Sequence, residues 1–254
     1  MLEIVQIPVL RDNYVYILHD AVSGETAVVD PAVAEPVEAA LTERGWALTH
    51  IFNTHHHGDH TGANLALKVA HEARIIGPAA ERDRIPGLDI AVGDGDIVAL
   101  GDHEARVFDV PGHTSGHIAY HFGDDDALFC GDTLFSMGCG RLFEGTPDQM
   151  WASLSKFITL PDKTRVFCAH EYTEANGRFA LTIEPNNAAL SRRMDEVKAL
   201  RAEGRATVPS TIGIEKATNP FLRAASEELQ DTVGMIGAPL PRIFAEVRTR
   251  KDHF

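Results

Sequence analysis

The sequence predicts a mixed α/β domain followed by a helical domain. Short segments with strand character recur between the N-terminus and residue 168, and several end just before a histidine or an aspartate. The segments with regular spacing after residue 173 are all of helical type. We therefore expect two domains, at residues 1–173 and 174–254.

The first part of the chain opens with alternating apolar residues and turn signals, which favour antiparallel strands. Gly45 is the expected stop of a first helix. In order, the sequence predicts strands at 3–9, 14–19 and 26–30, a helix at 36–44, a strand at 48–53, a helix at 62–72 and a strand at 74–77. Residues 78–95 are rich in loop signals and carry no assignment.

Strand character returns from Ile97. The sequence then predicts strands at 104–110, 117–122, 127–130 and 164–168, and helices at 174–183, 187–203 and 239–250. Thr146, Pro147 and Gln149 have the spacing of a capping box, which predicts a further helix from this point to about Ile158.

The most informative segment is the loop THHHGDH at residues 54–60. In an extended chain, residues two apart point the same way, so His55 and His57 can approach one metal ion while the histidine between them faces elsewhere. Gly58 permits a sharp turn, after which Asp59 and His60 come from another direction and suit a second ion. A polar loop with chance histidines is the alternative, and the density of ligands disfavours it.

Three further candidate ligands follow short apolar strands: His113, Asp132 and His170. Because strands of one sheet have their ends side by side, these exits and the histidine loop can converge on one crevice. A single histidine after a strand is more often an ordinary buried polar residue. Together with the loop, however, these residues indicate a metal centre.

The residues are sufficient for two ions that share one carboxylate. One set contains His55, His57, His113 and Asp132, and the other contains Asp59, His60, His170 and the same Asp132. Imidazole and carboxylate ligands suit zinc, iron and manganese alike. We expect two divalent ions, zinc first, with iron or manganese as alternatives.

Composition excludes several classes of partner. The formal net charge of −14 disfavours nucleic acid and anionic membranes, and no apolar run reaches the length of a membrane span. The three cysteines form no close pair and are odd in number, which favours a reducing compartment over a disulfide framework. With no secretory signal pattern at the N-terminus, we expect a cytoplasmic protein. We also expect a monomer.

The pattern His-x-His-x-Asp-His at 55–60 resembles the signature of the metallo-β-lactamase superfamily, which implies an αββα sandwich as the first domain. Other segments narrow the resemblance, which extends over nearly the whole chain, to glyoxalase II, the hydroxyacylglutathione hydrolase family. These segments are GCGRLFEGT at 138–146, CAHEYT at 168–173, EPNN at 184–187 and RTRKD at 248–252.

The resemblance implies a metal-dependent thioester hydrolase that converts S-D-lactoylglutathione to D-lactate and glutathione. A hydroxide that bridges the metals would attack the thioester, with Asp59 and Asp132 positioning it. The implied glutathione contacts are Arg141, Phe143, Tyr172, Arg248 and Lys251. Family members commonly have lysine at 141 and tyrosine at 143, so the phenylalanine here removes one hydrogen bond worth ~1 kcal/mol.

Several alternatives stay open on the sequence alone. Arg248 and Lys251 could simply stabilise the end of a helix, and Tyr172 could be a core aromatic. The main functional alternative is a persulfide dioxygenase on the same fold, and another is a superfamily thioesterase with different substrates, including coenzyme A thioesters. A metal-dependent nuclease is disfavoured by the acidic composition, and a non-catalytic binding module by the complete ligand set.

Overall fold

The computed structural model describes residues 1–254, and the chain divides into two compact units. The first unit contains residues 1–109 and 115–131, and the second contains 110–114 and 132–254. The sequence-based boundary between residues 173 and 174 stays a prediction.

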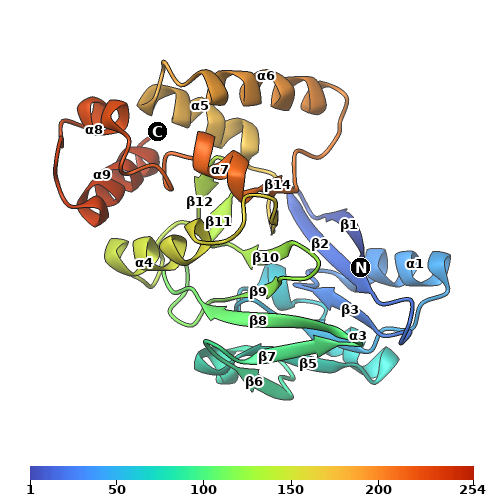
Figure 1. Cartoon of the computed structure of the whole chain (residues 1–254). Helices are drawn as coiled ribbons and strands as arrows, with labels where there is room; N and C mark the ends of the chain where they lie inside the picture. Colours follow the sequence, from blue (N-terminus) through green and yellow to red (C-terminus); the bar gives the residue numbers. More distant parts are fainter. The chain divides into compact units, whose positions relative to one another are not determined.

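The first unit contains a six-stranded sheet in which the strands follow one another in chain order (Figure 1). Its strands are β1 (Glu3–Val9), β2 (Asn13–His19), β3 (Thr26–Val29), β4 (His50–Phe52), β5 (Arg74–Pro78) and β6 (Ile90–Val92). The pairs from β1 to β3 are antiparallel, as the sequence predicts, and the pairs from β3 to β6 are parallel. The loop after β4 therefore leaves the carboxyl end of a strand between two parallel neighbours.

Helices α1 (Ala34–Arg44) and α3 (Asn64–His71) cover one face of this sheet. Val37 and Leu41 of α1 and Leu67 of α3 join Ile17 and Ile51 of the sheet in one buried core. Burying such side chains stabilises the unit by about 1.5–3 kcal/mol each. Helix α1 ends as predicted, with Gly45 in the left-handed conformation at φ 68°.

The same unit holds an antiparallel meander of β7 (Ile97–Leu100), β8 (His103–Asp109), β9 (Ile118–Phe122) and β10 (Ala127–Gly131). Two aromatic pairs join it to the other face of the first sheet. Phe52 stacks on Tyr120 with ring centroids 5.3 Å apart, and Tyr16 meets the edge of Phe129 at 5.6 Å. The two sheets therefore pack face to face, with helices outside the first.

The second unit is mainly helical, with two small strand pairs (Figure 1). Its elements are β11 (Leu134–Phe135), β12 (Gly138–Cys139), α4 (Pro147–Ile158), β13 (Arg165–Cys168), α5 (Thr173–Ile183), α6 (Ala188–Ala202), β14 (Ser210–Thr211), α7 (Ile212–Thr218), α8 (Glu227–Val233) and α9 (Leu240–Asp252). The capping box of Thr146 and Gln149 at the start of α4 is confirmed. Trp151 of α4 packs on Phe244 of α9.

The sequence misses the shortest elements. The unassigned stretch 78–95 contains the 3₁₀ helix η1 (Ala79–Arg84) and β6, while α2 (Gly58–Thr61), α7 and α8 are one or two turns long. Such segments are too short to display a hydrophobic period. None of the helices combines the length and the apolar character that crossing a membrane requires.

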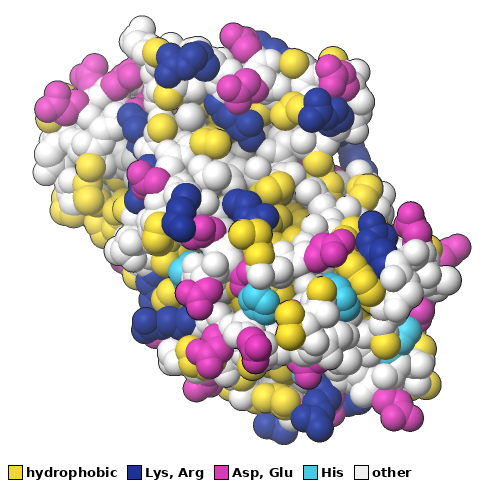
Figure 2. Space-filling model, turned by 45° about the vertical axis from the view of Figure 1, so that its right-hand side comes forward, with side chains coloured by type: hydrophobic (Ala, Val, Ile, Leu, Met, Phe, Trp, Pro, Cys, Tyr) yellow, Lys and Arg dark blue, Asp and Glu magenta, His cyan; other side chains and the backbone are white.

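Charged residues of both signs are intermixed on the surface. On the face drawn in Figure 2, acidic and basic side chains alternate over much of the area. The three cysteines are buried and free, so the prediction that they form no disulfide framework is confirmed.

Candidate metal centre

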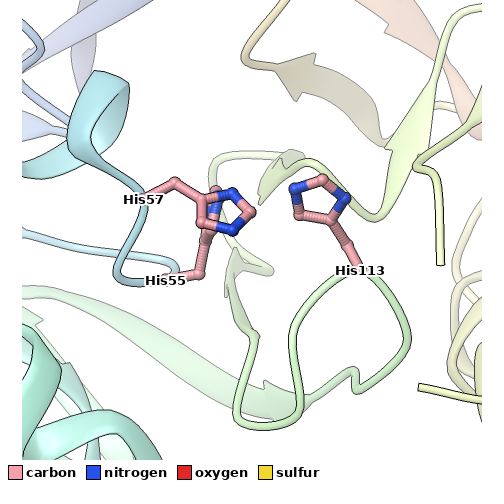
Figure 3. A group of neighbouring side chains, drawn as sticks. All are labelled: His55, His57 and His113. Carbon is pink, nitrogen blue, oxygen red and sulfur yellow. The ribbon is translucent and has the colours of Figure 1, made fainter. Parts of the chain in front are cut away.

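The histidine loop follows β4 and runs into α2, which contains Asp59 and His60. His55 and His60 are buried, whereas His57 and Asp59 are partly accessible. Figure 3 shows His55 and His57 projecting from the same loop. Their facing ring nitrogens, Nε2 of His55 and Nδ1 of His57, are 3.1 Å apart, so the loop brings the first predicted ligand pair together.

Asp30, at the end of β3, determines the tautomer of His55. The backbone N–H and the hydroxyl of Thr54 both donate to Asp30, at 2.8 and 2.6 Å. Because that hydroxyl proton is already donated, Thr54 Oγ1 accepts from Nδ1–H of His55 at 3.1 Å. Nε2 of His55 therefore carries the lone pair and presents it to His57.

The same carboxylate orients His60. Nδ1–H of His60 donates to Asp30 Oδ2 at 3.0 Å, which leaves Nε2 as the ligand nitrogen, 3.6 Å from Asp59 Oδ2. Asn13 in turn donates to Asp59 Oδ2 at 3.0 Å. Asp30, His55 and His60 offer ligand atoms within 4.8 Å of one another. Since Asp30 already accepts three hydrogen bonds, we interpret it as an orienting residue.

Asp30 is not among the site residues that the sequence predicts, although the sequence contains a signal for it. Asp30 comes at the end of a short apolar strand, and the predicted ligands also follow short apolar strands. His56, by contrast, is bound by Glu81. Its backbone N–H and ring Nδ1 both lie 2.8 Å from Glu81, a buried carboxylate that also accepts from the backbone of Gly116.

The other three predicted ligands lie in the second unit. His113, also drawn in Figure 3, lies on the loop after β8, Asp132 follows β10, and His170 follows β13. Nε2 of His113 and Nε2 of His170 lie 3.4 and 3.3 Å from the same oxygen, Oδ2 of Asp132. All three side chains are buried, so one carboxylate oxygen joins two imidazoles within this unit.

A backbone carbonyl fixes the tautomer of His113. Because a carbonyl oxygen only accepts, Nδ1–H of His113 donates to the carbonyl of Arg141 at 2.9 Å. Nε2 is then a second acceptor that faces the carboxylate of Asp132. A ring nitrogen and a carboxylate oxygen that both carry lone pairs require a proton or a metal cation between them when they lie this close. The ligand atoms of each unit therefore suit a divalent ion.

Two predicted substrate residues lie against ligand histidines. The ring of Tyr172 stacks on His170 at 4.8 Å with an interplanar angle of 1°, and the ring of Phe143 lies 5.1 Å from His113. Tyr172 and Phe143 are 37% and 63% exposed, so both can also contact a bound molecule. Tyr172 is therefore more than a core aromatic.

Arg248 is buried and has protein partners. Its guanidinium donates to the carbonyl of Cys139 at 3.1 Å and to Asp252 at 2.8 Å, and it lies 5.0 Å from the ring centroid of Phe221. Burial raises the pKa of the neighbouring Cys139 thiol to about 11. Arg248 thus links α9 to β12, which gives it a structural role beside any contact with substrate.

Lys251 is half-buried on α9. Its ammonium donates to the carbonyl of Ala175 at 3.3 Å and lies over the rings of Phe179 and Phe254, at 5.1 and 5.2 Å. Burial lowers the pKa of Lys251 to about 8. Three neighbouring cations lower this pKa further: Arg248, Arg178 and Arg141.

A buried carboxylate holds the hairpin that follows Asp132. Glu215 accepts from the backbone N–H of Met137 at 2.7 Å and from Asn219 at 2.9 Å. Desolvation raises the pKa of Glu215. The sequence gives no sign of this role, because Glu215 and Met137 are far apart in the chain and meet only after folding.

Two face-to-face sheets with a His-x-His-x-Asp-His loop at the end of a parallel strand define a protein of the metallo-β-lactamase class. The family model of the metallo-beta-lactamase superfamily matches residues 9–170. A second model, described as hydroxyacylglutathione hydrolase C-terminus, matches residues 171–254. The predicted fold class, an αββα sandwich with a helical C-terminal region, is confirmed.

Relatives of known name match over the full length. Hydroxyacylglutathione hydrolase of Methylococcus capsulatus is 61% identical over 254 residues, which cover 100% of this chain and 99% of the relative. That of Rhodospirillum rubrum is 56% identical over 253 residues, again 100% and 99% of the two chains. The crystal structure of ETHE1 from Myxococcus xanthus has a TM-score of 0.67 and 28% identity, and covers 98% of both chains. The chain belongs to the hydroxyacylglutathione hydrolase family.

Proposed function

We propose that this protein hydrolyses S-D-lactoylglutathione to D-lactate and glutathione. The observation that carries the proposal is the full-length similarity to hydroxyacylglutathione hydrolases, at 61% identity, which includes the C-terminal segment specific to them. This similarity favours a thioester hydrolase over the persulfide dioxygenase alternative.

The proposed metal ligands are those that the sequence predicts. One ion would be held by His55, His57, His113 and Asp132, and the other by Asp59, His60, His170 and Asp132. The orientation of the imidazoles within each unit supports this assignment, because Nε2 of His55, His60 and His113 carries a lone pair. Zinc is our first assignment, and iron and manganese suit the same ligands.

Bound divalent ions lower the pKa of water and stabilise the charge that develops on the thioester oxygen and the leaving thiolate. The chain's own residues do the positioning. Asp59 and Asp132 orient the attacking water with their carboxylates, and Asn13 holds Asp59 in place through its 3.0 Å hydrogen bond. A covalent intermediate on serine or cysteine is not needed, and the raised pKa of the buried Cys168 thiol, about 12, argues against such a role there.

Arg141, Phe143, Tyr172, Arg248 and Lys251 are the proposed contacts of the glutathione portion. Their cations complement its two carboxylates, and their aromatic rings border the ligand histidines. Lys251 is half-buried and Arg248 is buried, so we assign the larger share of substrate attraction to Lys251.

The direct test is hydrolysis of S-D-lactoylglutathione by purified protein, with metal content measured on the same sample. We expect thioester cleavage that disappears with chelation and returns with metal, and much weaker cleavage of coenzyme A thioesters. Oxygen uptake with glutathione persulfide, without thioester cleavage, would overturn the proposal.

Cellular location and assembly are also proposals. The buried, free cysteines support a reducing compartment, and we propose a cytoplasmic monomer. Light scattering of the eluting protein at several concentrations tests the monomer, since a dimer would have twice the chain mass of 27.7 kDa.

A further inference from the structure

One face of α5 borders the ammonium of Lys251. That ammonium donates to the carbonyl of Ala175 at 3.3 Å and lies 5.1 Å from the ring centroid of Phe179. Positions three apart in a helix share one face, so Arg178 lies on the same side of α5 as Ala175, whose carbonyl accepts from Lys251. None of the sequence motifs of the predicted site includes Arg178.

The surroundings of Lys251 are crowded with like charge. Besides burial, the causes that lower its pKa to about 8 are, in order of size, Arg248, Arg178 and Arg141. Arg178 is thus one of the cations around Lys251, as Arg141 is, although only Arg141 was predicted as a substrate residue. Cations held together in a chain of net charge −14 raise the free energy of the folded protein unless an anion binds among them.

We infer that Arg178 is a substrate-binding residue, which pairs with a carboxylate of the glutathione portion next to Lys251 and gives up Glu174 in exchange. This inference rests on the proposed function and adds to it a specificity-determining residue and a competing carboxylate.

The ion pair between Arg178 and Glu174, which the substrate carboxylate would have to replace, is weak. Nη1 of Arg178 lies 2.9 Å from Oε1 of Glu174, four residues earlier on α5, and the two side chains are 56% and 47% exposed. Exposed pairs of this spacing contribute about 0.3–0.5 kcal/mol. A substrate carboxylate that contacts Arg178 and Lys251 together gains more than this, so it can replace Glu174.

The exchange predicts opposite effects of the two partners. In the metal-loaded enzyme, Arg178→Ala should raise KM for S-D-lactoylglutathione about threefold to fivefold with kcat unchanged. Glu174→Gln should lower KM about twofold, because substrate no longer competes with it. Arg178→Lys should recover most of the affinity, and Glu174→Gln should have no effect once Arg178 is alanine.

A matched control is the pair Lys198 and Asp195, also exposed, on α6 at 4.0 Å. Lys198→Ala removes the same charge and should leave KM unchanged, since Lys198 is not among the cations that act on Lys251. Thermal unfolding of each variant, followed by circular dichroism, checks that the fold is retained. Binding of the product glutathione, measured by calorimetry, should follow the same order as KM.

The decisive comparison uses a neutral substrate, the lactoyl thioester of N-acetylcysteamine, which has no carboxylate on its thiol portion. Its KM should be the same for wild type and Arg178→Ala. An unchanged KM for S-D-lactoylglutathione in Arg178→Ala, or an equal rise for both substrates, would overturn the inference. Wild-type protein that cleaves no glutathione thioester would instead refute the proposed function.

Discussion

The predicted ligands of the two units are positioned in different ways. In the first unit, the ligands lie within a few residues of one another, and the side chain of Asp30 orients both His55 and His60. In the second unit, the ligands come from three separate loops, and a backbone carbonyl orients His113. The same lone pair on Nε2 therefore depends on a replaceable side chain in one unit and on the main chain in the other.

The ligands of the two units also differ in the side chains that surround them. Phe143 and Tyr172, the aromatic residues proposed to contact substrate, lie against His113 and His170 of the second unit. The first unit orients its ligands through a network of buried polar side chains. We therefore expect substitutions in the first unit to act mainly on metal affinity, and substitutions in the second to act on substrate as well.

The largest effect is expected for Asp132→Asn. Its Oδ2 faces both His113 and His170, and it is the carboxylate proposed for both ions. Loss of this charge should release both ions and lower kcat/KM at least about a thousandfold, since bound metal contributes several kcal/mol to the transition state. Metal analysis by mass spectrometry, together with the thioester assay, measures both.

His57→Ala is the matched comparison from the first unit. It removes a ligand proposed for one ion only, so it should retain more metal than Asp132→Asn although hydrolysis is abolished. Equal metal loss in the two variants would contradict the shared role of Asp132. Full activity of His57→Ala would contradict the proposed centre.

Asp30→Asn should weaken metal binding without removing a ligand. An amide has one acceptor oxygen where the carboxylate has two, so it cannot accept from Thr54 and His60 as Asp30 does. The expected loss in metal affinity is about tenfold to a hundredfold. Titration against a chromophoric chelator measures it.

Thr54→Val provides the control for that network. It removes the hydroxyl that accepts from His55 and leaves the bond between Asp30 and His60 in place, so its effect should be smaller than that of Asp30→Asn. If both variants bind metal as tightly as the wild type, side-chain orientation in the first unit is not what fixes the ligands.

A pH effect is expected in the second unit. The pKa of Lys251 is lowered to about 8, first by burial and then by neighbouring arginines, and a lysine carries its charge only below its pKa. As pH rises from 7 to 9, the free enzyme loses this charge, and KM for the anionic substrate should rise about fivefold to tenfold. Steady-state kinetics across this range measures the change.

Lys251→Met distinguishes the contribution of Lys251 to the pH dependence of KM from that of other titrating groups, including the amino group of the substrate. The variant should have a raised KM already at pH 7, with kcat little changed, and no further rise assignable to residue 251. If wild type and variant have parallel profiles, the helix-end interpretation of Lys251 holds instead.

The sequence predicts those parts of the fold and site that depend on neighbouring residues. The apolar run of β2, the glycine at the end of α1 and the capping box of α4 are local signals, and the structure has each of them. The ligand pair of His55 and His57 follows from strand alternation alone.

What the sequence could not predict depends on contacts between distant segments. Asp30 acquires its role only when β3 lies beside β4, and Glu215 only when α7 meets the hairpin at Met137. The motif that contains Arg248 does not indicate whether its side chain is exposed or buried. Only its contacts with Cys139 and Phe221 in the folded protein show that it is buried. The residues 78–95 were unassigned because η1 and β6 are short and lack a period.

The smallest effect concerns the residue that departs from the family pattern. Phe143 is 63% exposed, with its ring 5.1 Å from His113, so a hydroxyl added at its tip has room to reach substrate. Phe143→Tyr should therefore lower KM about fivefold, the equivalent of one hydrogen bond of ~1 kcal/mol, with kcat unchanged. Phe108→Tyr, on a half-buried ring of β8, should leave KM unchanged. An unaltered KM in Phe143→Tyr would mean that the ring acts only by packing against the ligand histidine, and the second unit would then bind substrate through its cations and Tyr172.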